Sequence, residues 1–357
     1  MLGRGIDQIM PHPSGPQLRE PYVQDAREYV ALAVAENGPI PGPVDFRYVW
    51  GDALAELERV QPDFRVINLE TSVTASNNYW PNKDIHYRMH PKNARCLNEA
   101  RIDCAVLANN HVLDFGYPGL SETLATLDAA GIKTAGAGED MERASEPAVL
   151  GGGRQNRVLV YACAHGSSGV SADWSAEKDK AGINFLPDFS DASFSRIKVD
   201  IAARKKPGDI AIFSIHWGEN WGYEVDERHR QFGHRLIDEA GIDAVHGHSS
   251  HHAKGIELYR SKVILYGCGD FIDDYEGISG YETFRTDLRL MYFVRLNPAD
   301  GTLISLQMTP MQVKRFRLQY AAKEDARWLS EVLTRAGEKF GARIELTSQN
   351  VLQLVSQ

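Results

Sequence analysis

Apolar and polar positions along the chain follow an order that predicts helices and buried strands in turn. Amphipathic helices are predicted over 46–60, 91–101, 118–130 and 226–240. Between these segments lie short, nearly continuous apolar runs at 64–70, 103–111, 157–166 and 209–218. Because buried strands show such runs, helices and strands are expected to alternate, and this order predicts an α/β fold.

The pattern differs at the two ends of the chain. A helix is predicted over 20–36, between segments rich in proline and turn residues. After residue 254 the sequence predicts two β-hairpins, over 255–271 and 288–313, and the second turns at "NPADG". Hairpins added to an alternating α/β core favour mixed sheets.

The C-terminal segment predicts one more helix, over 323–340. Its apolar side carries Trp328, Leu329, Val332 and Leu333. We expect a single domain over residues 1–357, on which residues 315–357 pack as an extension of helix and strand.

Composition narrows the class of protein. Of the 357 residues 43% are hydrophobic, and the formal net charge of −9 makes a nucleic-acid-binding surface an unfavourable interpretation. No apolar run approaches the roughly 18–20 residues that span a bilayer, and "MLGRGIDQIM" lacks the apolar core of a signal peptide. As it stands, the sequence is expected to be cytoplasmic. The four cysteines form no CxxC pair and are predicted to be buried free thiols.

Polar residues follow several of the apolar runs, at the points where the strands should end. They are Asn68 and Glu70, then Asn109, Asn110, His111 and Asp114, then His216 and Glu219, then His246, His248 and His251. The last group lies in "DAVHGHSSHHAKG", which holds four of the chain's 12 histidines. Because ligands of α/β sheets bind beyond the carboxyl ends of the strands, these side chains are expected to meet at one edge.

Two interpretations of this cluster remain open from the residues alone. Each member has an ordinary structural explanation: an exposed loop for the histidines, a turn for the paired asparagines, a helix cap for Glu70. Together they favour a metal site, since imidazole, carboxylate and amide groups suit Mn²⁺, Fe²⁺ or Zn²⁺. A site for two ions needs a bridging carboxylate, and Glu70 is the candidate.

Five motifs occur in order along the chain. They are "MLGRGID", "VINLET", "LANNHVLDFG", "IHWGENW" and "VHGHSSHHAKGIELYRSKVILYGCGDF". Together they resemble the motifs of the bacterial poly-gamma-glutamate capsule-synthesis (CapA-like) family, a branch of the calcineurin-like metallophosphoesterase superfamily. The resemblance covers almost the whole chain, and it implies a four-layer α/β/β/α sandwich of two mixed β-sheets with the site across one sheet edge.

The resemblance also implies roles for individual residues. The implied metal ligands are Glu70, Asn110, His216, His248 and His251. His111, with Asp114, takes the catalytic place as general acid or transition-state donor. The residues implied at the substrate or behind the ligands are Asn68, Arg4, His246 and Glu219. The implied cofactor is one or two divalent ions of manganese, iron or zinc.

Three features depart from the family pattern. The family places a metal-binding Asp two residues before the Met of its opening motif, so we expect the first strand and its Asp to be missing here through a start codon assigned too late. With a longer N-terminus the expected location becomes membrane-associated or extracytoplasmic. The family's "GHHPH" is "GHSSH" here, with Ser249 and Ser250, and its "GNF" is "GDF", which makes Asp270 either a further charge near the site or a turn residue.

The function that the resemblance implies is metal-assisted hydrolysis of the phosphoesterase type within capsule poly-gamma-glutamate synthesis. Two alternatives remain: a non-hydrolytic accessory that binds polyglutamate or a partner during polymer synthesis and export, and amide-bond chemistry at the same metals. The expected partners are a small-molecule or polyglutamate-type substrate and membrane-associated capsule machinery, and not nucleic acid.

Overall fold

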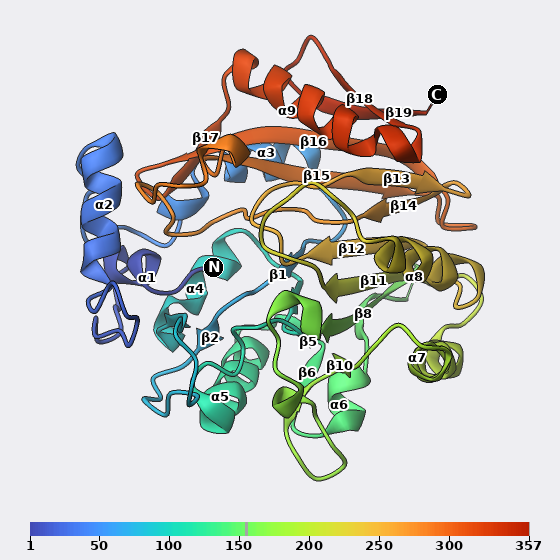
Figure 1. The fold of residues 1–357 in the computed structure, drawn as a ribbon, viewed down its shortest axis with the longest axis horizontal. Helices are drawn as coiled ribbons and strands as arrows, with labels where there is room; N and C mark the ends of the chain where they lie inside the picture. The colour runs from blue at the N-terminus through green and yellow to red at the C-terminus, as the bar shows by residue number, and fades with distance from the viewer. Residues whose placement is uncertain (154–155, 357) are drawn as a thin grey trace.

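The computed structural model describes residues 1–153 and 156–356, and within them the chain builds three main β-sheets (Figure 1). The sheets have seven, three and five strands. The predicted α/β class with a mixed sheet is confirmed, because the seven-stranded sheet combines parallel and antiparallel pairs.

The seven-stranded sheet runs through the middle of the molecule (Figure 1). Its strands in spatial order are β10 (Phe185–Leu186), β8 (Arg157–His165), β11 (Ile210–His216), β12 (Ala244–His248), β14 (Lys262–Leu265) and β13 (Ile256–Tyr259), and β7 (Ala148–Gly151) also pairs with β8. Helices α7 (Asp191–Arg204) and α8 (Glu227–Asp238) cover one face through a cluster that includes Phe194, Phe213 and Phe232. Because β11 is buried on both faces, its sequence is almost continuously apolar.

The three-stranded sheet packs against the other face. It consists of the parallel strands β1 (Val66–Asn68), β4 (Cys104–Val106) and β5 (Lys133–Ala135), and α5 (Gly116–Ala129) packs on β5. Ala105 of β4 and Ala162 of β8 belong to one buried cluster. Since this cluster joins the two sheets, the ends of β1 and β4 can meet the ends of β11 and β12.

The five-stranded sheet is antiparallel and carries the C-terminal part of the chain (top of Figure 1). Its strands are β15 (Leu288–Leu296), β16 (Leu303–Lys314), β19 (Leu352–Ser356) and β18 (Ala342–Leu346), with β17 (Arg317–Tyr320) paired to β16. Helix α9 (Lys323–Gly337) packs on β18. Leu329 of α9 and Val263 of β14 share a buried cluster, which attaches this part to the central sheet.

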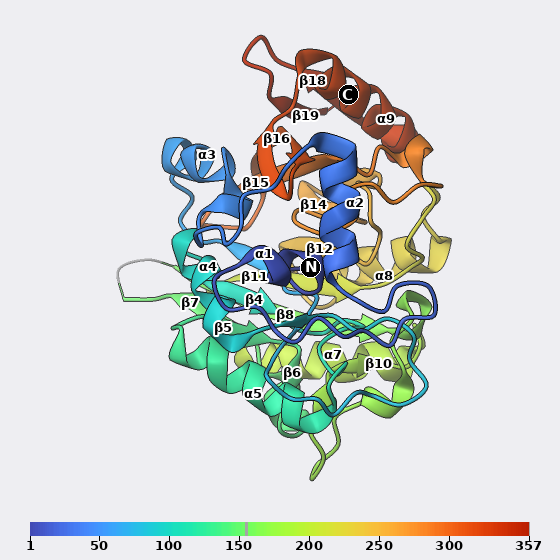
Figure 2. The same cartoon turned by 90° about the vertical axis from the view of Figure 1, so that its left-hand side faces the viewer.

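The remaining α-helices and strands have between 2 and 11 residues. They are α1 (Gly5–Ile9), α2 (Arg27–Asn37), α3 (Ala53–Val60), α4 (Arg95–Glu99), α6 (Met141–Ser145), β2 (Ser72–Val73), β3 (Arg88–Met89), β6 (Ala137–Gly138) and β9 (Gly182–Ile183). Figure 2 shows α1, α2 and the N-terminus together on one side of the molecule.

Most predicted elements occur, with different bounds. Both predicted hairpins are confirmed as β13–β14 and β15–β16. The helix predicted over 46–60 is interrupted at Gly51, whose φ is 46° and whose missing Cβ would lie 2.0 Å from the carbonyl oxygen of Leu318. Glycine at this position therefore lets the backbone of β17 approach the backbone of residue 51 closely.

Helix α7 is absent from our sequence-based expectations. Its apolar residues form a weak stripe, and Val199 is exposed on it. A start signal was nevertheless present in the sequence, because the Ser190 side chain caps the helix by accepting from the Ser193 backbone N–H.

Two expectations from composition can be compared with the structure. All four cysteines are free, and three of them are buried. Within residues 1–153 and 156–356, no helix combines the length and the apolar character needed to cross a membrane.

A buried ionic network fixes the N-terminal segment to the loop after β14. The Arg4 guanidinium donates to both oxygens of Asp274, at 2.7 and 3.1 Å, and to Glu20 Oε1 at 2.9 Å. The rings of Tyr29 and Tyr87 lie 3.9 and 4.1 Å from its central carbon. Arg4 was expected at the substrate or behind the ligands, and in this structure most of its donors bind Asp274, Glu20 and Tyr29.

Replacement of Arg4 by methionine should strongly destabilise the protein. The change leaves Glu20 and Asp274, both buried, without their cation, and loss of one partner from a buried ion pair costs about 3–5 kcal/mol. Urea unfolding followed by circular dichroism measures the effect. The matched control is Arg27→Met, because Arg27 pairs with Asp25 at the surface and should matter little. Equal effects of the two changes would contradict this account of Arg4.

Candidate functional site

Strands β11 and β12 place four polar side chains on one face of the central sheet. Their parallel register sets Ser214 beside His246 and His216 beside His248. The Ser214 hydroxyl lies 2.9 Å from His246 Nδ1 and 3.0 Å from His248 Nε2. His216 Nδ1 and His248 Nδ1 are 2.7 Å apart, so these two imidazoles hydrogen-bond to each other.

Two residues from the three-stranded sheet reach the same histidines. Asn110, after β4, places its Oδ1 3.1 Å from His216 Nε2. Glu70, after β1, places its Oε1 3.9 Å from the same nitrogen. The other carboxylate oxygen of Glu70 accepts from Asn68 Nδ2 at 2.9 Å, and Asn109 in turn donates to Asn68 Oδ1 at 3.0 Å. Side chains that follow three strands of two sheets therefore converge on His216.

Burial determines the charge of this pocket. It raises the pKa of Glu70 to about 7, and it holds the pKa values of His216 and His248 well below their usual range. Burial also lowers the pKa of His246 to about 4. The three imidazoles are therefore neutral at pH 7, which leaves ring nitrogens able to accept a proton or to bind a cation.

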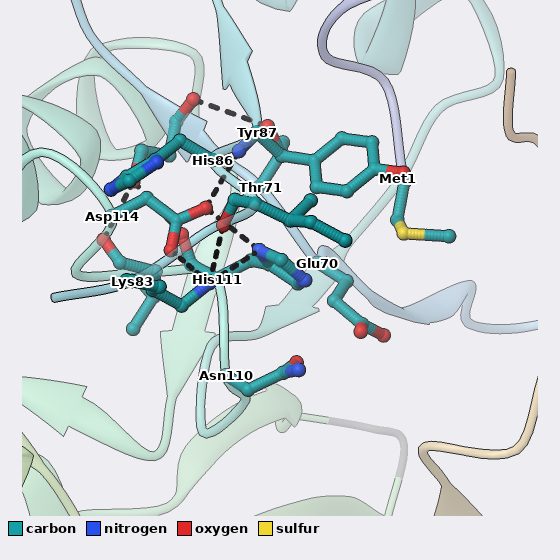
Figure 3. A network of polar contacts seen from close by, with 12 residues as sticks. Met1, Glu70, Thr71, Lys83, His86, Tyr87, Asn110, His111 and Asp114 are labelled. Carbon is teal, nitrogen blue, oxygen red and sulfur yellow. Dashed lines mark hydrogen bonds and ion pairs between the residues drawn. The ribbon is translucent and has the colours of Figure 1, made fainter. Parts of the chain in front are cut away.

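His111 is held beside this pocket by Asp114. His111 Nδ1 lies 2.7 Å from Asp114 Oδ2, and that oxygen also accepts from the Tyr87 backbone N–H at 2.6 Å. Figure 3 shows His111 between Asp114 on one side and Glu70 and Asn110 on the other. Burial, together with the Lys83 ammonium, lowers the pKa of His111 to about 4.

His251 belongs to a separate ion pair. Its Nδ1 lies 2.8 Å from Asp270 Oδ2. Burial alone would lower the pKa of His251, but the Asp270 carboxylate raises it overall, and the positive charge of His251 lowers the pKa of Asp270. Asp270, which the sequence left open as a turn residue or an extra charge, is a partly buried partner of a site histidine. The positive charge of His251 also lowers the pKa of Glu70, so His251 acts on the pocket through its charge.

Other residues proposed for the site lie elsewhere. Glu219 is exposed. Its carboxylate acts on Lys254, where it offsets part of the lowering of the Lys254 pKa by burial. His252 is buried, and its ring stacks on Phe284 and lies 4.6 Å from Tyr223. Asn68 and His246 do lie behind the converging residues, as described above.

The aromatic residues after β11 divide into two groups. Trp217 points inward and stacks on His229. Trp221 stacks on Tyr281 with ring centroids 4.1 Å apart, and its ring lies 5.3 Å from that of His251. An aromatic pair therefore lies beside the histidine end of the pocket.

Sequence reasoning missed Ser214 and Lys83. The signal for Ser214 was present, because residues two positions apart on a strand share a face and Ser214 precedes His216 by two. Lys83 lies in the segment between β2 and β3, where no periodicity relates it to the strand ends. Its ammonium is 2.7 Å from Asp114 Oδ1.

The donors of the pocket suit a divalent cation in chemistry and partly in arrangement. Glu70 Oε1, Asn110 Oδ1 and His216 Nε2 converge, and within the described residues no hydrogen-bond donor lies at bonding distance from Glu70 Oε1. His248 and His251 are engaged with His216 and Asp270 instead. Counting His, Cys, Asp and Glu alone, residues 1–153 and 156–356 contain no group of three placed to hold a metal ion.

Comparisons with known proteins give a consistent result. Residues 1–275 match the family model described as "Bacterial capsule synthesis protein PGA_cap". The chain is 50% identical, over 99% of its length and 93% of the relative's, to a protein of Mycobacterium tuberculosis named "Probable polyglutamine synthesis accessory protein". It is 27% identical, over 73% of its length and 67% of the relative's, to the "PGA biosynthesis protein CapA" of Bacillus subtilis. It is 24% identical, over 65% of its length and 53% of the relative's, to the "Capsule biosynthesis protein CapA" of Bacillus anthracis.

Replacement of Ser214 by alanine should destabilise the protein without a change of fold. The Ser214 hydroxyl can donate to one ring nitrogen and accept from the other, so its loss leaves a ring nitrogen of the buried His248 and one of the partly buried His246 without a partner, at a cost of about 1–3 kcal/mol. Urea unfolding measures the difference. Ser121→Ala is the control, because Ser121 lies exposed on α5 and should contribute little. A Ser214→Ala protein as stable as the control would show that the histidines find other partners.

Proposed function

The chain belongs to the bacterial capsule synthesis protein family PGA_cap, and from this membership we propose that it assists the synthesis of a polyglutamate-type polymer by metal-assisted hydrolysis at the pocket around His216. The observation that supports the proposal most is the meeting of three donor atoms of different kinds at one buried place. Glu70 Oε1 and Asn110 Oδ1 lie 3.9 and 3.1 Å from His216 Nε2.

In the proposal Glu70, Asn110 and His216 hold one divalent ion, and His248 and His251 are the next ligands along the same wall. Carboxylate, amide and neutral imidazole form a donor set that suits manganese, iron or zinc. An ion of this kind supplies Lewis-acid chemistry, since it makes water more acidic and neutralises charge on a substrate oxygen. Glu70 benefits from it directly, because a cation would favour the ionised form of a carboxylate whose pKa burial raises.

His111 is the residue that we propose to move a proton. Its Nδ1 is bonded to Asp114, so exchange with substrate or water goes through Nε2. After burial, His111 is the next cause that lowers the pKa of His216, which is consistent with a common reaction site. Asp114 touches no reacting atom in this scheme and keeps the imidazole oriented.

The proposal includes the finer fold assignment. The three-stranded and seven-stranded sheets share a buried cluster, and helices α5, α7 and α8 pack on their outer sides. This arrangement supports the proposed four-layer α/β/β/α sandwich of the metallophosphoesterase kind, with the site at the carboxyl ends of β1, β4, β11 and β12.

A second candidate is a non-hydrolytic accessory role, in which the protein binds the growing polymer or a component of capsule machinery. One observation favours it: a relative is named as an accessory protein. Amide-bond chemistry on a glutamyl substrate at the same residues is a variant of the first proposal. The two roles differ in whether His111 matters for turnover.

The hydrolase proposal predicts turnover that depends on His111. Protein incubated with Mn²⁺ is expected to hydrolyse an aryl phosphate ester, and His111→Ala should reduce kcat by about 10²–10⁴-fold, the usual contribution of a positioned proton donor. Release of the phenol followed by absorbance measures the rate. The exposed His12 provides the control, since His12→Ala should leave the rate unchanged. Retention of polyglutamate with no turnover on phosphate or γ-glutamyl substrates would favour the accessory role.

The proposal also predicts which residues determine ion binding. Glu70→Gln and His216→Ala should each lower the ratio of bound Mn²⁺ to protein about tenfold or more at limiting ion concentration. The ratio is measured by elemental analysis after gel filtration. Glu58→Gln, an exposed glutamate on α3, is the matched control. Unchanged ion content in both site variants would eliminate the pocket as the ion site.

A further inference from the structure

We propose that Lys83 is a positioning residue, whose ammonium holds the Asp114 carboxylate where it accepts a hydrogen bond from the Nδ1–H of His111, so that Nε2 stays unprotonated for the reaction. The proposal deepens the function proposed above, and its catalytic consequence rests on that function. Its structural content, the tautomer of His111, does not.

The contacts of Lys83 connect its flexible side chain to one carboxylate. Lys83 Nζ lies 2.7 Å from Asp114 Oδ1 and 2.7 Å from the Ile85 carbonyl oxygen (Figure 3). Asp114 is completely buried. Apart from this ion pair, Asp114 Oδ1 has no hydrogen-bond partner within the described residues. Lys83 is therefore the group that compensates this oxygen.

The other oxygen of Asp114 determines the state of His111. Asp114 Oδ2 accepts from the Tyr87 backbone N–H at 2.6 Å and lies 2.7 Å from His111 Nδ1. An ionised carboxylate has no proton to give, so the ring nitrogen must donate. In a neutral imidazole a proton on Nδ1 leaves Nε2 as the acceptor.

A third contact of Lys83 does not change this assignment. Lys83 Nζ is 3.2 Å from His111 Nδ1. Since Nδ1 already donates to Asp114, and an ammonium can only donate, these two atoms share no proton. Lys83 thus acts on His111 through Asp114. Its ammonium lies on the side of the ring that faces away from Glu70 and Asn110.

A simpler role has to be separated from this one. Lys83 also bonds to Ile85, two residues further along the same segment, so it could serve only to order the segment between β2 and β3. If Lys83 only orders this segment, its loss should change stability alone. If Lys83 positions Asp114, its loss should also change which ring nitrogen of His111 carries the proton. The two roles therefore differ in the nuclear magnetic resonance of the imidazole nitrogens.

The test compares Lys83→Met and Lys83→Arg in protein treated with a chelator. Ring ¹⁵N shifts of His111, assigned by their loss in His111→Gln, report the tautomer. The wild type should show a protonated Nδ1 and a bare Nε2. Lys83→Met should shift both signals towards the average of two tautomers, and Lys83→Arg should restore them, since a guanidinium also pairs with a carboxylate. Lys92→Met, at an exposed lysine on a neighbouring segment, should match the wild type.

The outcomes separate this proposal from the proposed function. A folded Lys83→Met protein with wild-type His111 signals overturns the positioning role. If Lys83→Met does not fold, Lys83→Gln makes the same comparison, because its shorter, uncharged side chain also removes the ion pair. Where turnover is found, the Lys83→Met kcat should fall roughly 10–100-fold, part of the effect of a positioned proton donor, with KM within about twofold. Shifted His111 signals without turnover by any variant would retain the role of Lys83 and reject the hydrolase.

Discussion

The parallel pairing of β11 with β12 is the constraint on which the candidate site depends. It sets Ser214 beside His246 and His216 beside His248, and it fixes these residues on the face that the three-stranded sheet covers. A shift of one residue in this register would turn the histidines of one strand to the opposite face. The buried apolar residues of β11, such as Phe213 and Ile215, pack on the helix side and hold the register.

Burial then decides the chemistry of the polar face. Water is largely excluded, so the imidazoles are neutral and pair with one another or with Ser214. Glu70 is the exception, because its charge has no cationic partner at hydrogen-bond distance in the described structure. A buried carboxylate beside neutral imidazole nitrogens is the electrostatic reason to propose a cation at this place.

Ionic networks on both sides of the pocket keep its walls in place. Arg4 joins the N-terminal segment to Asp274, and Arg289 pairs with Asp273 in the same loop. Asp270, which holds His251, lies in that loop as well. On the other side Lys83, Asp114 and His111 join the segment between β2 and β3 to the turn after β4. Charges in the interior thus tie together segments that are distant in sequence.

The sequence by itself determined the α/β class, the two hairpins and the strand ends that carry Glu70, Asn110, His216 and His248, because periodicity and apolar runs are local properties of the chain. It also carried the motifs of the family. Only the tertiary structure decided the partners of these residues. Arg4 became part of a buried network, Asp270 became the partner of His251, and Lys83 reached Asp114 from a segment without any pattern. Such pairings depend on which distant segments pack together. A local pattern of apolar and polar residues does not indicate which segments those are.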